Sequence, residues 1–329
     1  MTPDLKPLSI GPIRVHLPVV LAPMAGYTDL PFRLLCRRMG AAYCTTEMML
    51  DKMLFVRGPL PGRMTALSDD DHPVAGQIIG NEPDVMAAAA AELCTRGFDV
   101  VDLNFACPVR KALSRRRGGY LMKEPARAAR IVQAVVAEAD RPVTLKLRQR
   151  FAESGDDGAF WRIAEAAFDA GAAAVCVHAR SVQAMYRGPA DWEFIAAVKR
   201  RYPDRTIIGS GDVKTPQVAL DMLRQTGADG VSVARAALGN PWFFRDVADL
   251  AAGRGPRHPS LAEQRQVMED HFVGACELHG PDRGPKIMRK HGIRYARLHA
   301  RPKAMRVAFV AVKTAAHWRR VLEEYYTPD

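Results

Sequence analysis

The stretch "FDVVDLNFACP", Phe98–Pro108, shows the pattern that decides the fold. Val100–Asn104 is a short apolar run that ends in an asparagine, which is typical of a strand buried in a parallel sheet. Cys107 follows and precedes a proline, in a loop that soon becomes basic. Because most cysteines are inert packing residues, a role for this thiol has to be argued from its neighbours.

Seven further runs of this kind occur along the chain, and helical patterns separate most of them. The eight expected strands are Val19–Ala22, Ala42–Thr46, Val74–Ile79, Val100–Asn104, Val143–Leu147, Ala174–His178, Thr206–Gly209 and Asp229–Ala234. The clearest helical segments are Pro83–Arg96, Pro125–Ala139, Asp157–Ala170 and Pro216–Thr226. Strand–helix alternation predicts a parallel sheet. Eight such units in about 250 residues fit an α/β fold of the (β/α)8 TIM-barrel type.

A doubly wound sheet is the structural alternative. Such a sheet typically has a glycine-rich fingerprint after its first strand, whereas the first run here continues as "LAPMAGYTD", Leu21–Asp29. Thr215-Pro216 and Asn240-Pro241 each predict a helix start, with a capping side chain before a first-turn proline. The barrel is therefore the preferred fold.

The chain after the barrel is expected to form a small all-helical domain. "GRGPRHPS", Gly253–Ser260, has the composition of a linker. Ser260 and Glu263 have the spacing of a capping box. The helices expected after it are Leu261–His279, Pro285–Leu298 and Pro302–Tyr325. We therefore divide the chain into a catalytic barrel (residues 1–252), a linker (253–260) and a helical domain (261–329).

The composition is ordinary for a globular protein, with 48% hydrophobic and 25% charged residues. Met1–Leu8 lacks the pattern of a signal peptide and no apolar run is long enough to span a bilayer. We therefore expect a cytoplasmic protein with no membrane partner. The six cysteines form no CxxC pair or other metal-ligand spacing. This absence predicts reduced thiols and no metal site.

The net charge is +11, and it is unevenly distributed. Residues 251–329 contain 15 Lys+Arg and 8 Asp+Glu, a surplus of +7, whereas residues 1–250 contain 32 and 28, a surplus of +4. A basic surplus favours a polyanionic partner. A merely soluble cationic surface is the alternative.

Polar residues follow nearly every expected strand, where the active site of a TIM barrel lies. Lys146 is flanked by apolar residues and must face the barrel interior or water, because an unpaired buried charge is costly. Gln77 and Lys146 can hydrogen-bond a planar ring rich in heteroatoms. The glycine-containing loop after the seventh strand and Arg235 after the eighth occupy the usual phosphate site. These positions predict a large phosphorylated ligand.

Six motifs, in this order and at these spacings, resemble the flavin-dependent tRNA-dihydrouridine synthases. They are "LAPMAGYTDLPFR", "DLNFACP", "VTLKLR", "VHARS", "GSGDV" and "ARAALGNPWFF". The resemblance covers residues 17 to about 250. "HGIRY", His291–Tyr295, also resembles the helical tail of the bacterial B-type members.

The resemblance implies an enzyme that uses FMN and NADPH to reduce the C5=C6 bond of specific uridines in tRNA to dihydrouridine. Hydride passes from reduced FMN to C6, and Cys107 gives a proton to C5. A thiol with an ordinary pKa of about 8.5 is protonated at neutral pH and can act as this acid. The residues that the resemblance assigns to FMN are Ala22, Pro23, Met24, Gln77, Lys146 and His178, with Ser210, Gly211, Asp212, Ala234 and Arg235 at its phosphate. The resemblance also places Asn104 at the uracil or the flavin edge, and the other candidate substrate residues are Arg180 and the loop cations Arg110, Lys111 and Arg115.

The chain departs from the family pattern at four positions. Ala106 and Ala234 stand where the family has glycine, Ser210 where it has asparagine, and Ser181 where it has threonine. These departures leave open an RNA-binding homologue with weakened catalysis. An FMN-barrel oxidoreductase acting on a small molecule is the other alternative.

Two basic segments favour RNA over a small molecule. Five cations lie within residues 110–117, directly after Cys107. The helical tail adds nine more between Arg283 and Arg306, with His291 and Tyr295 among them. Cations mixed with rings that can stack suit structured RNA. Barrel and tail together predict a monomer that binds tRNA and extrudes the target base from its stack.

Overall fold

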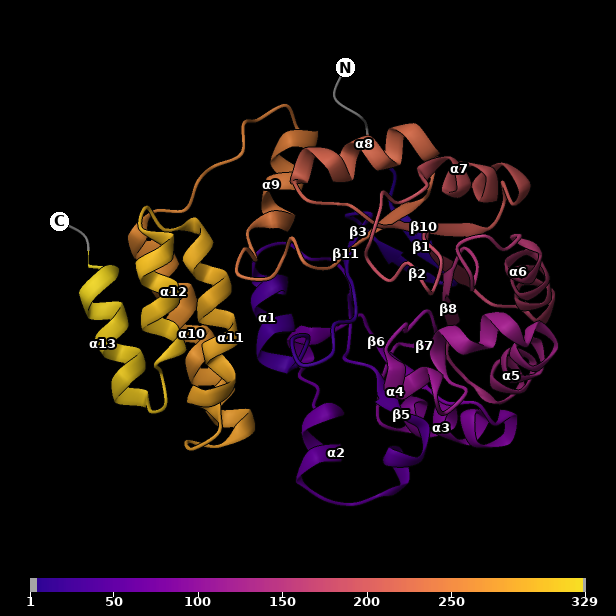
Figure 1. Ribbon diagram of the computed structural model, residues 1–329, viewed down its shortest axis with the longest axis horizontal. Coiled ribbons are helices and arrows are strands. Elements are labelled where there is room, and N and C mark those ends of the chain that lie inside the picture. The colour runs from indigo at the N-terminus through magenta and orange to yellow at the C-terminus, as the bar shows by residue number, and fades with distance from the viewer. Residues whose placement is uncertain (1–4, 328–329) are drawn as a thin grey trace.

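The computed structural model describes residues 5–327, and its centre is a closed barrel of eight parallel strands (Figure 1). The strands are β3 (Val19–Leu21), β4 (Cys44–Thr45), β6 (Val74–Ile79), β7 (Val100–Phe105), β8 (Val143–Arg148), β9 (Ala174–His178), β10 (Thr206–Ser210) and β11 (Gly230–Val233). Successive strands pair in parallel, and β11 pairs with β3 to close the ring. All eight predicted strands, and the TIM barrel itself, are confirmed.

Two short additions complete the sheet structure. β5 (Met49–Leu50) continues the second barrel strand along β6, with Met49 opposite Ile78. β1 (Leu8–Ile10) and β2 (Ile13–Val15) form an antiparallel hairpin before the barrel. Ile10 from this hairpin lines a cavity inside the barrel, so the hairpin closes one end of the barrel interior.

Helices surround the barrel and cover the outer faces of the strands (Figure 1). The main ones are α1 (Leu30–Arg38), α3 (Pro83–Thr95), α5 (Pro125–Glu138), α6 (Gly158–Ala170), α7 (Trp192–Arg201), α8 (Pro216–Thr226) and α9 (Phe243–Ala251). The shorter helical segments are η1 (Asp51–Phe55), α2 (Pro59–Met64), η2 (Asp69–Asp71), α4 (Arg110–Leu113) and η3 (Gly118–Lys123). Every residue of β6 and β7 is buried, because helices cover one face and the barrel interior receives the other.

One of the two predicted helix starts is wrong. The Thr215 side chain accepts the N–H of Val218 and caps α8 as predicted. Asn240 does not cap α9, which begins at Phe243 with no side-chain cap. The backbone carbonyl of Asn240 accepts the Phe243 N–H instead, because a turn separates the asparagine from the helix.

The tail forms a helical bundle beside the barrel (Figure 1). It contains α10 (Leu261–His279), α11 (Gly284–Tyr295), η4 (Ala296–Leu298), α12 (Pro302–Val310) and α13 (Ala315–Tyr325). The capping box of Ser260 and Glu263 is present, and α10 has the predicted bounds. No helix in residues 5–327 is long and apolar enough to cross a membrane.

The prediction of one helix over Pro302–Tyr325 is wrong, because the chain breaks between α12 and α13. Thr314 caps α13 by accepting the N–H of His317. The break brings Trp318 against Phe309 and Phe272, with ring centroids 5.0 Å apart in each pair. A buried aromatic cluster therefore replaces a continuous helix.

The tail packs directly against α1, the first helix of the barrel (Figure 1). Arg38 pairs with Asp270 at 2.8 Å, and His279 Nε2 lies 2.8 Å from the carboxylate of Asp29. Asp29 is also the N-cap of α1. The tail is thus joined to the element that follows the first loop of the barrel mouth.

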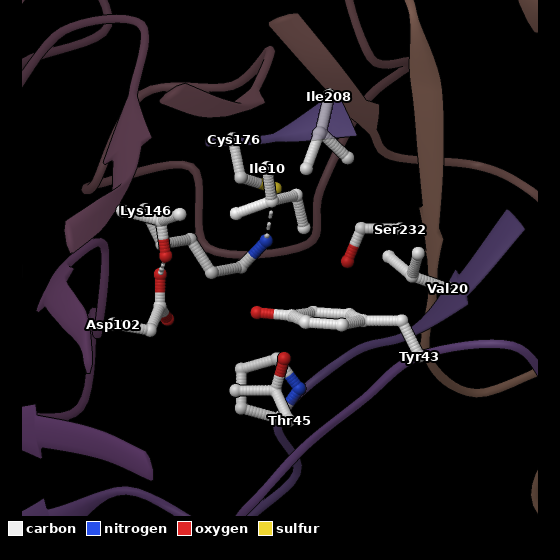
Figure 2. Close-up of a pocket in the computed structure, with 11 residues that line it drawn as sticks. Ile10, Val20, Tyr43, Thr45, Asp102, Lys146, Cys176, Ile208 and Ser232 are labelled. Carbon is white, nitrogen blue, oxygen red and sulfur yellow. Dashed lines mark hydrogen bonds between the residues drawn. The ribbon is translucent and has the colours of Figure 1, made fainter. Parts of the chain in front are cut away.

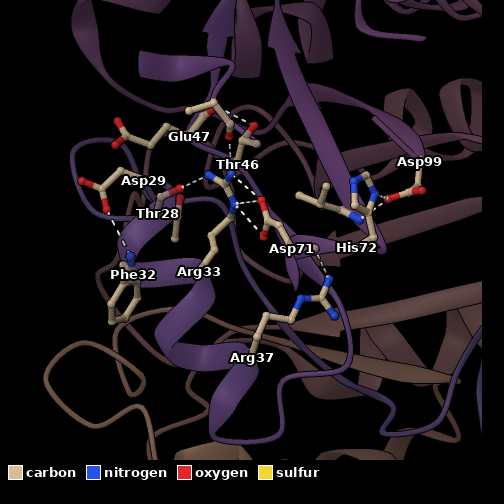
Figure 3. Close-up of polar contacts among 12 residues, drawn as sticks. Thr28, Asp29, Phe32, Arg33, Arg37, Thr46, Glu47, Asp71, His72 and Asp99 are labelled. Atoms are coloured by element: carbon tan, nitrogen blue, oxygen red, sulfur yellow. Dashed lines mark hydrogen bonds and ion pairs between the residues drawn. The ribbon is translucent and has the colours of Figure 1, made fainter. Parts of the chain in front are cut away.

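A buried ion pair fixes that same loop (Figure 3). Arg33 pairs with Asp71 at 2.6 Å, and both side chains are almost fully buried. The same guanidinium donates to the carbonyl of Thr28 at 2.9 Å and to that of Ala66 at 2.9 Å. One arginine therefore joins α1 to the loops that follow β3 and precede β6.

Candidate active site

Lys146 on β8 points into the barrel interior near the mouth (Figure 2). Its Nζ lies 3.1 Å from Cys176 Sγ and 3.5 Å from Ser210 Oγ. Among the described residues, no carboxylate lies within ion-pair distance of Lys146, which is unusual for a half-buried cation. This ammonium group is therefore available to an electron-rich ligand.

A small cavity lies inside the barrel beside Lys146 (Figure 2). The Tyr43 hydroxyl and the Asp102 carboxylate point toward it, and burial raises the pKa of both groups. The full lining is Ile10, Val20, Pro23, Tyr43, Thr45, Asp102, Thr144, Lys146, Cys176, Ile208 and Ser232. The barrel interior around this cavity is thus partly polar rather than filled by aliphatic side chains alone.

The first mouth loop is clamped on both sides of Gly26. Glu47, after β4, accepts the Gly26 N–H at 2.6 Å, and burial raises the pKa of this carboxyl group. Lys290, from α11 of the tail, donates to the Gly26 carbonyl. Pro23 and Met24 precede this clamp and are half-buried, so they lie on a fixed loop at the mouth.

Cys107 lies just past the end of β7 and is 8% exposed. Burial raises the pKa of its thiol, while the neighbouring Val109 N–H and Arg148 act in the opposite direction. Its backbone N–H donates to Asn104 Oδ1 at 2.9 Å, and its carbonyl accepts from Gly119 at 3.0 Å. The thiol is therefore protonated at neutral pH and held on an ordered backbone.

Gly118 and Gly119 pack against this cysteine. A Cβ on Gly118 would lie 2.9 Å from Cys107 Cβ, and Gly118 has φ +58°. A side chain at Gly118 would collide with Cys107, and one at Gly119 would collide with Val182 and crowd the Cys107 carbonyl. Both glycines therefore have a packing role.

Gln77 and Asn104, two of the predicted contact residues, are buried and bound to each other. Asn104 Nδ2 donates to Gln77 Oε1 at 2.8 Å, and Gln77 Nε2 donates to Asp102 at 2.6 Å. Gln77 keeps one N–H and one lone pair for a ligand, whereas the Asn104 oxygen already accepts the N–H groups of Ala106 and Cys107 and its nitrogen also faces Met48 Sδ at 3.7 Å. A ligand contact at Gln77 is thus additional to its internal bonds, and one at Asn104 would have to replace the weak contact with Met48.

Arg148 at the end of β8 connects two mouth loops. Its guanidinium donates to the carbonyls of Ala106 and Ser181, each at 3.1 Å. Among the described residues it has no carboxylate partner, and burial lowers its pKa to about 10. The Tyr186 ring lies 5.6 Å from Arg148 Cζ and 5.1 Å from Arg235 Cζ. A buried cation without a counter-charge therefore lies beside the Cys107 loop.

The two loops expected to bind phosphate lie on adjacent strands. In residues 5–327 the N–H groups of Gly211, Asp212, Arg235 and Ala236 donate to no backbone acceptor. Gly211 has φ +126°, and a Cβ there would lie 2.7 Å from the Ala190 side chain. These free donors and the exposed Arg235 form an arrangement that suits a phosphate group.

Arg180, which the sequence assigned to the substrate, is occupied inside the protein. It pairs with Asp212 at 2.6 Å and donates to the Gly188 carbonyl at 2.7 Å. His178 Nε2 lies 3.3 Å from the same guanidinium, and burial together with nearby cations lowers its pKa well below the usual value. The substrate role of Arg180 stays a prediction, and its visible role is to order the loop around Asp212.

The basic loop after Cys107 is open to solvent. Arg110, Lys111 and Arg115 are exposed, and none forms an ion pair with a described residue. Arg116 instead pairs with Glu124. The three free cations remain candidates for contact with phosphate groups.

Asp102 and Thr144 are functional candidates that sequence reasoning missed, and it also missed the contact of the tail cation Lys290 with the Gly26 loop. Asp102 and Thr144 lie two positions before Asn104 and Lys146 on the same strands, so each pair faces the same side. That spacing was a usable signal. No sequence signal pointed to the contact between Lys290 and Gly26, because it joins positions 264 residues apart.

Three matches to known proteins point to one family. The family model for dihydrouridine synthase (Dus) matches residues 20–327. The tRNA-dihydrouridine synthase B of Xanthomonas axonopodis pv. citri is 37% identical over 98% of this chain and 92% of its own. A probable tRNA-dihydrouridine synthase of Mycobacterium tuberculosis H37Rv is 38% identical over 93% of this chain and 82% of its own.

A solved structure supports the fold alone. Histamine dehydrogenase from Rhizobium sp. 4-9 superposes with a TM-score of 0.59 at 14% identity. The match covers 82% of this chain and 50% of that chain, so this protein spans about half its length. The family resemblance in the sequence is confirmed, and the chain belongs to the dihydrouridine synthase family of enzymes.

Proposed function

We propose that the protein reduces the C5=C6 bond of specific uridines in tRNA to dihydrouridine, with FMN as its cofactor and NADPH as its reductant. Membership of the family supports the reaction, and the names of the relatives support tRNA as the substrate. A uracil ring is reduced when hydride reaches one carbon of this bond and a proton reaches the other. The chain has to supply the proton and the positioning.

The residues at the mouth fit FMN. The free N–H groups of Gly211, Asp212, Arg235 and Ala236 suit its phosphate. Lys146 offers a cation to the ring, and Pro23 and Met24 supply an apolar face. When bound, FMN would supply the hydride that C6 of the uracil receives.

Cys107 is the proposed acid that gives its proton to C5. Proton transfer by a positioned acid is worth about 10²- to 10⁴-fold in rate. The observation that carries this proposal is the set of contacts at Cys107, with a raised thiol pKa, a fixed N–H and burial at the mouth. The thiolate that remains regains its proton from solvent.

Two groups of cations are proposed to bind the phosphates of the RNA. Arg110, Lys111 and Arg115 are exposed in the loop that follows Cys107, and the tail adds half-buried cations near Tyr27, including Lys290 and Arg294. We further propose that residues 1–252 form the catalytic domain and residues 261–329 an RNA-binding domain, in a cytoplasmic monomer. The direct contacts between tail and α1 support a fixed RNA-binding surface that spans both.

Purified protein tests the proposal directly. It should contain flavin and, with NADPH, convert uridines to dihydrouridine in tRNA that lacks the modification, as mass spectrometry of nuclease digests will measure. Free uridine should react at least about 100-fold more slowly, because it lacks the phosphate contacts. Equal turnover of free uridine would favour a small-molecule oxidoreductase, and a protein that binds tRNA but holds no flavin would favour an RNA-binding homologue.

A further inference from the structure

A row of buried hydrogen bonds runs from β8 through β7 and β6 to the Cys107 backbone. Thr144 Oγ1 donates to Asp102 Oδ1 at 2.6 Å, and Gln77 Nε2 donates to Asp102 Oδ2 at 2.6 Å. Asn104 Nδ2 then donates to Gln77 Oε1 at 2.8 Å. Asn104 Oδ1 accepts the N–H of Cys107 at 2.9 Å. Each side chain is at most 7% exposed, so water does not compete for these bonds.

The direction of this row is fixed at the cysteine end. The N–H groups of Ala106 and Cys107 can only donate, so the oxygen of Asn104 must face them. Its nitrogen must then face the oxygen of Gln77. The nitrogen of Gln77 is left as a donor that needs an acceptor, and Asp102 provides it.

Asp102 is the only carboxylate in the row, and it accepts the N–H that Gln77 must present once the cysteine end has fixed both amides. Burial raises its pKa, whereas Thr144, Gln77 and Lys146 act in the opposite direction. If Asp102 takes up a proton, that proton can lie toward Thr144 while the other oxygen still accepts from Gln77. The Thr144–Asp102 bond would then reverse, whereas the bonds from Asp102 through Gln77 and Asn104 to the Cys107 backbone keep the same direction in either protonation state.

The placement of this carboxylate is costly for a purely structural residue. A buried carboxyl group loses its hydration, and apolar residues fill a barrel interior without that loss. A polar row that ends at the thiol-bearing loop indicates positioning of the thiol. We propose that Asp102 is a positioning residue that anchors Gln77 and Asn104 in the orientation required at the cysteine end and so holds Cys107 over the substrate carbon. This inference rests on the proposed role of Cys107 as the acid.

The rates of the two half-reactions distinguish a positioning role of Asp102 from a general loss of structure. The rate at which NADPH bleaches bound flavin does not involve the thiol, whereas the rate at which tRNA restores the flavin absorbance does. We expect Asp102→Leu to slow the tRNA step about 100-fold, since a misplacement of about 1 Å costs about that much. The NADPH step should change less than about threefold. Asp102→Asn should keep the tRNA step within about threefold of wild type, because its oxygen can accept from Gln77 and its nitrogen can donate to Thr144.

The double variant with Cys107→Ala distinguishes this inference from the proposed function. If Asp102 acts through the thiol, adding Asp102→Leu to Cys107→Ala produces no further loss. A further 100-fold loss, or a tRNA step in Asp102→Leu within about threefold of wild type, overturns the positioning role. Wild-type rates in Cys107→Ala alone would instead overturn the acid itself.

A compensating pair keeps the test valid if Asp102→Leu does not fold. Gln77→Glu places two carboxyl groups together and should slow the tRNA step. Gln77→Glu with Asp102→Asn restores a full row, because the new amide at position 102 can donate to the new carboxylate at position 77, which still accepts from Asn104. The pair should recover at least about tenfold over Gln77→Glu. No recovery would contradict the inference.

Discussion

Replacing Cys107 by alanine separates a catalytic thiol from a packing residue. The change removes only Sγ and keeps Cβ, which is the atom that Gly118 approaches, and the backbone bonds to Asn104 and Gly119 remain. Because the side chain is buried, the lost packing should cost about 1 kcal/mol of unfolding free energy. Loss of a general acid should instead slow the tRNA step about 10²- to 10⁴-fold, equivalent to about 3 to 5 kcal/mol of barrier.

The assay is single-turnover reaction of NADPH-treated enzyme with unmodified tRNA, followed by flavin absorbance and by the yield of dihydrouridine. Cys36→Ala is the matched control, since Cys36 is a fully buried thiol on α1. It should cost similar stability but leave the tRNA step unchanged. The reasoning is refuted if Cys107→Ala and Cys36→Ala react with tRNA at the same rate.

Three other outcomes follow from the charges in the structure. Burial raises the pKa of Cys107, and the protonated thiol is the active form, so activity should persist below that pKa and fall only as pH rises through it; a fall in single-turnover rate centred near pH 7 would contradict this. Asp71→Asn leaves the buried Arg33 without a counter-charge and should cost about 3 to 5 kcal/mol in urea unfolding; a loss below about 1 kcal/mol would show that Thr28 and Ala66 suffice. Replacing Arg110, Lys111 and Arg115 by alanine should reduce the slope of log Kd for tRNA against log salt by about 2 to 3, and an unchanged slope would place the RNA elsewhere.

The barrel could be predicted from the sequence because the patterns that mark its strands and helices are local. Each strand is a short apolar run with turn residues on both sides, and most are followed by a helical pattern. The break between α12 and α13 was missed because the helical pattern continues on both sides of it. Trp318 stacks on Phe272, which lies 46 positions earlier in the chain, and this contact offsets the loss of helical hydrogen bonds at the break.

The positions of the candidate site residues could be predicted, but their internal bonds could not. Polar residues at strand ends predicted that Lys146, Asn104 and Cys107 lie together at one end of the barrel, and their roles stay a prediction. The clamp on Gly26 from Lys290 joins distant segments, and no local pattern encodes it. The pairing of Arg180 with Asp212 was likewise hidden, because a cation near a predicted phosphate site has the same sequence signature whether it binds the ligand or orders a loop.

The proposed reaction is tested most directly by mapping dihydrouridine in tRNA from cells with and without this gene. Deletion should abolish the modification at one or more tRNA positions. A plasmid with the wild-type gene should restore it, and one with the Cys107→Ala variant should not. Dihydrouridine at full level at every tRNA position in the deleted strain would contradict the proposal.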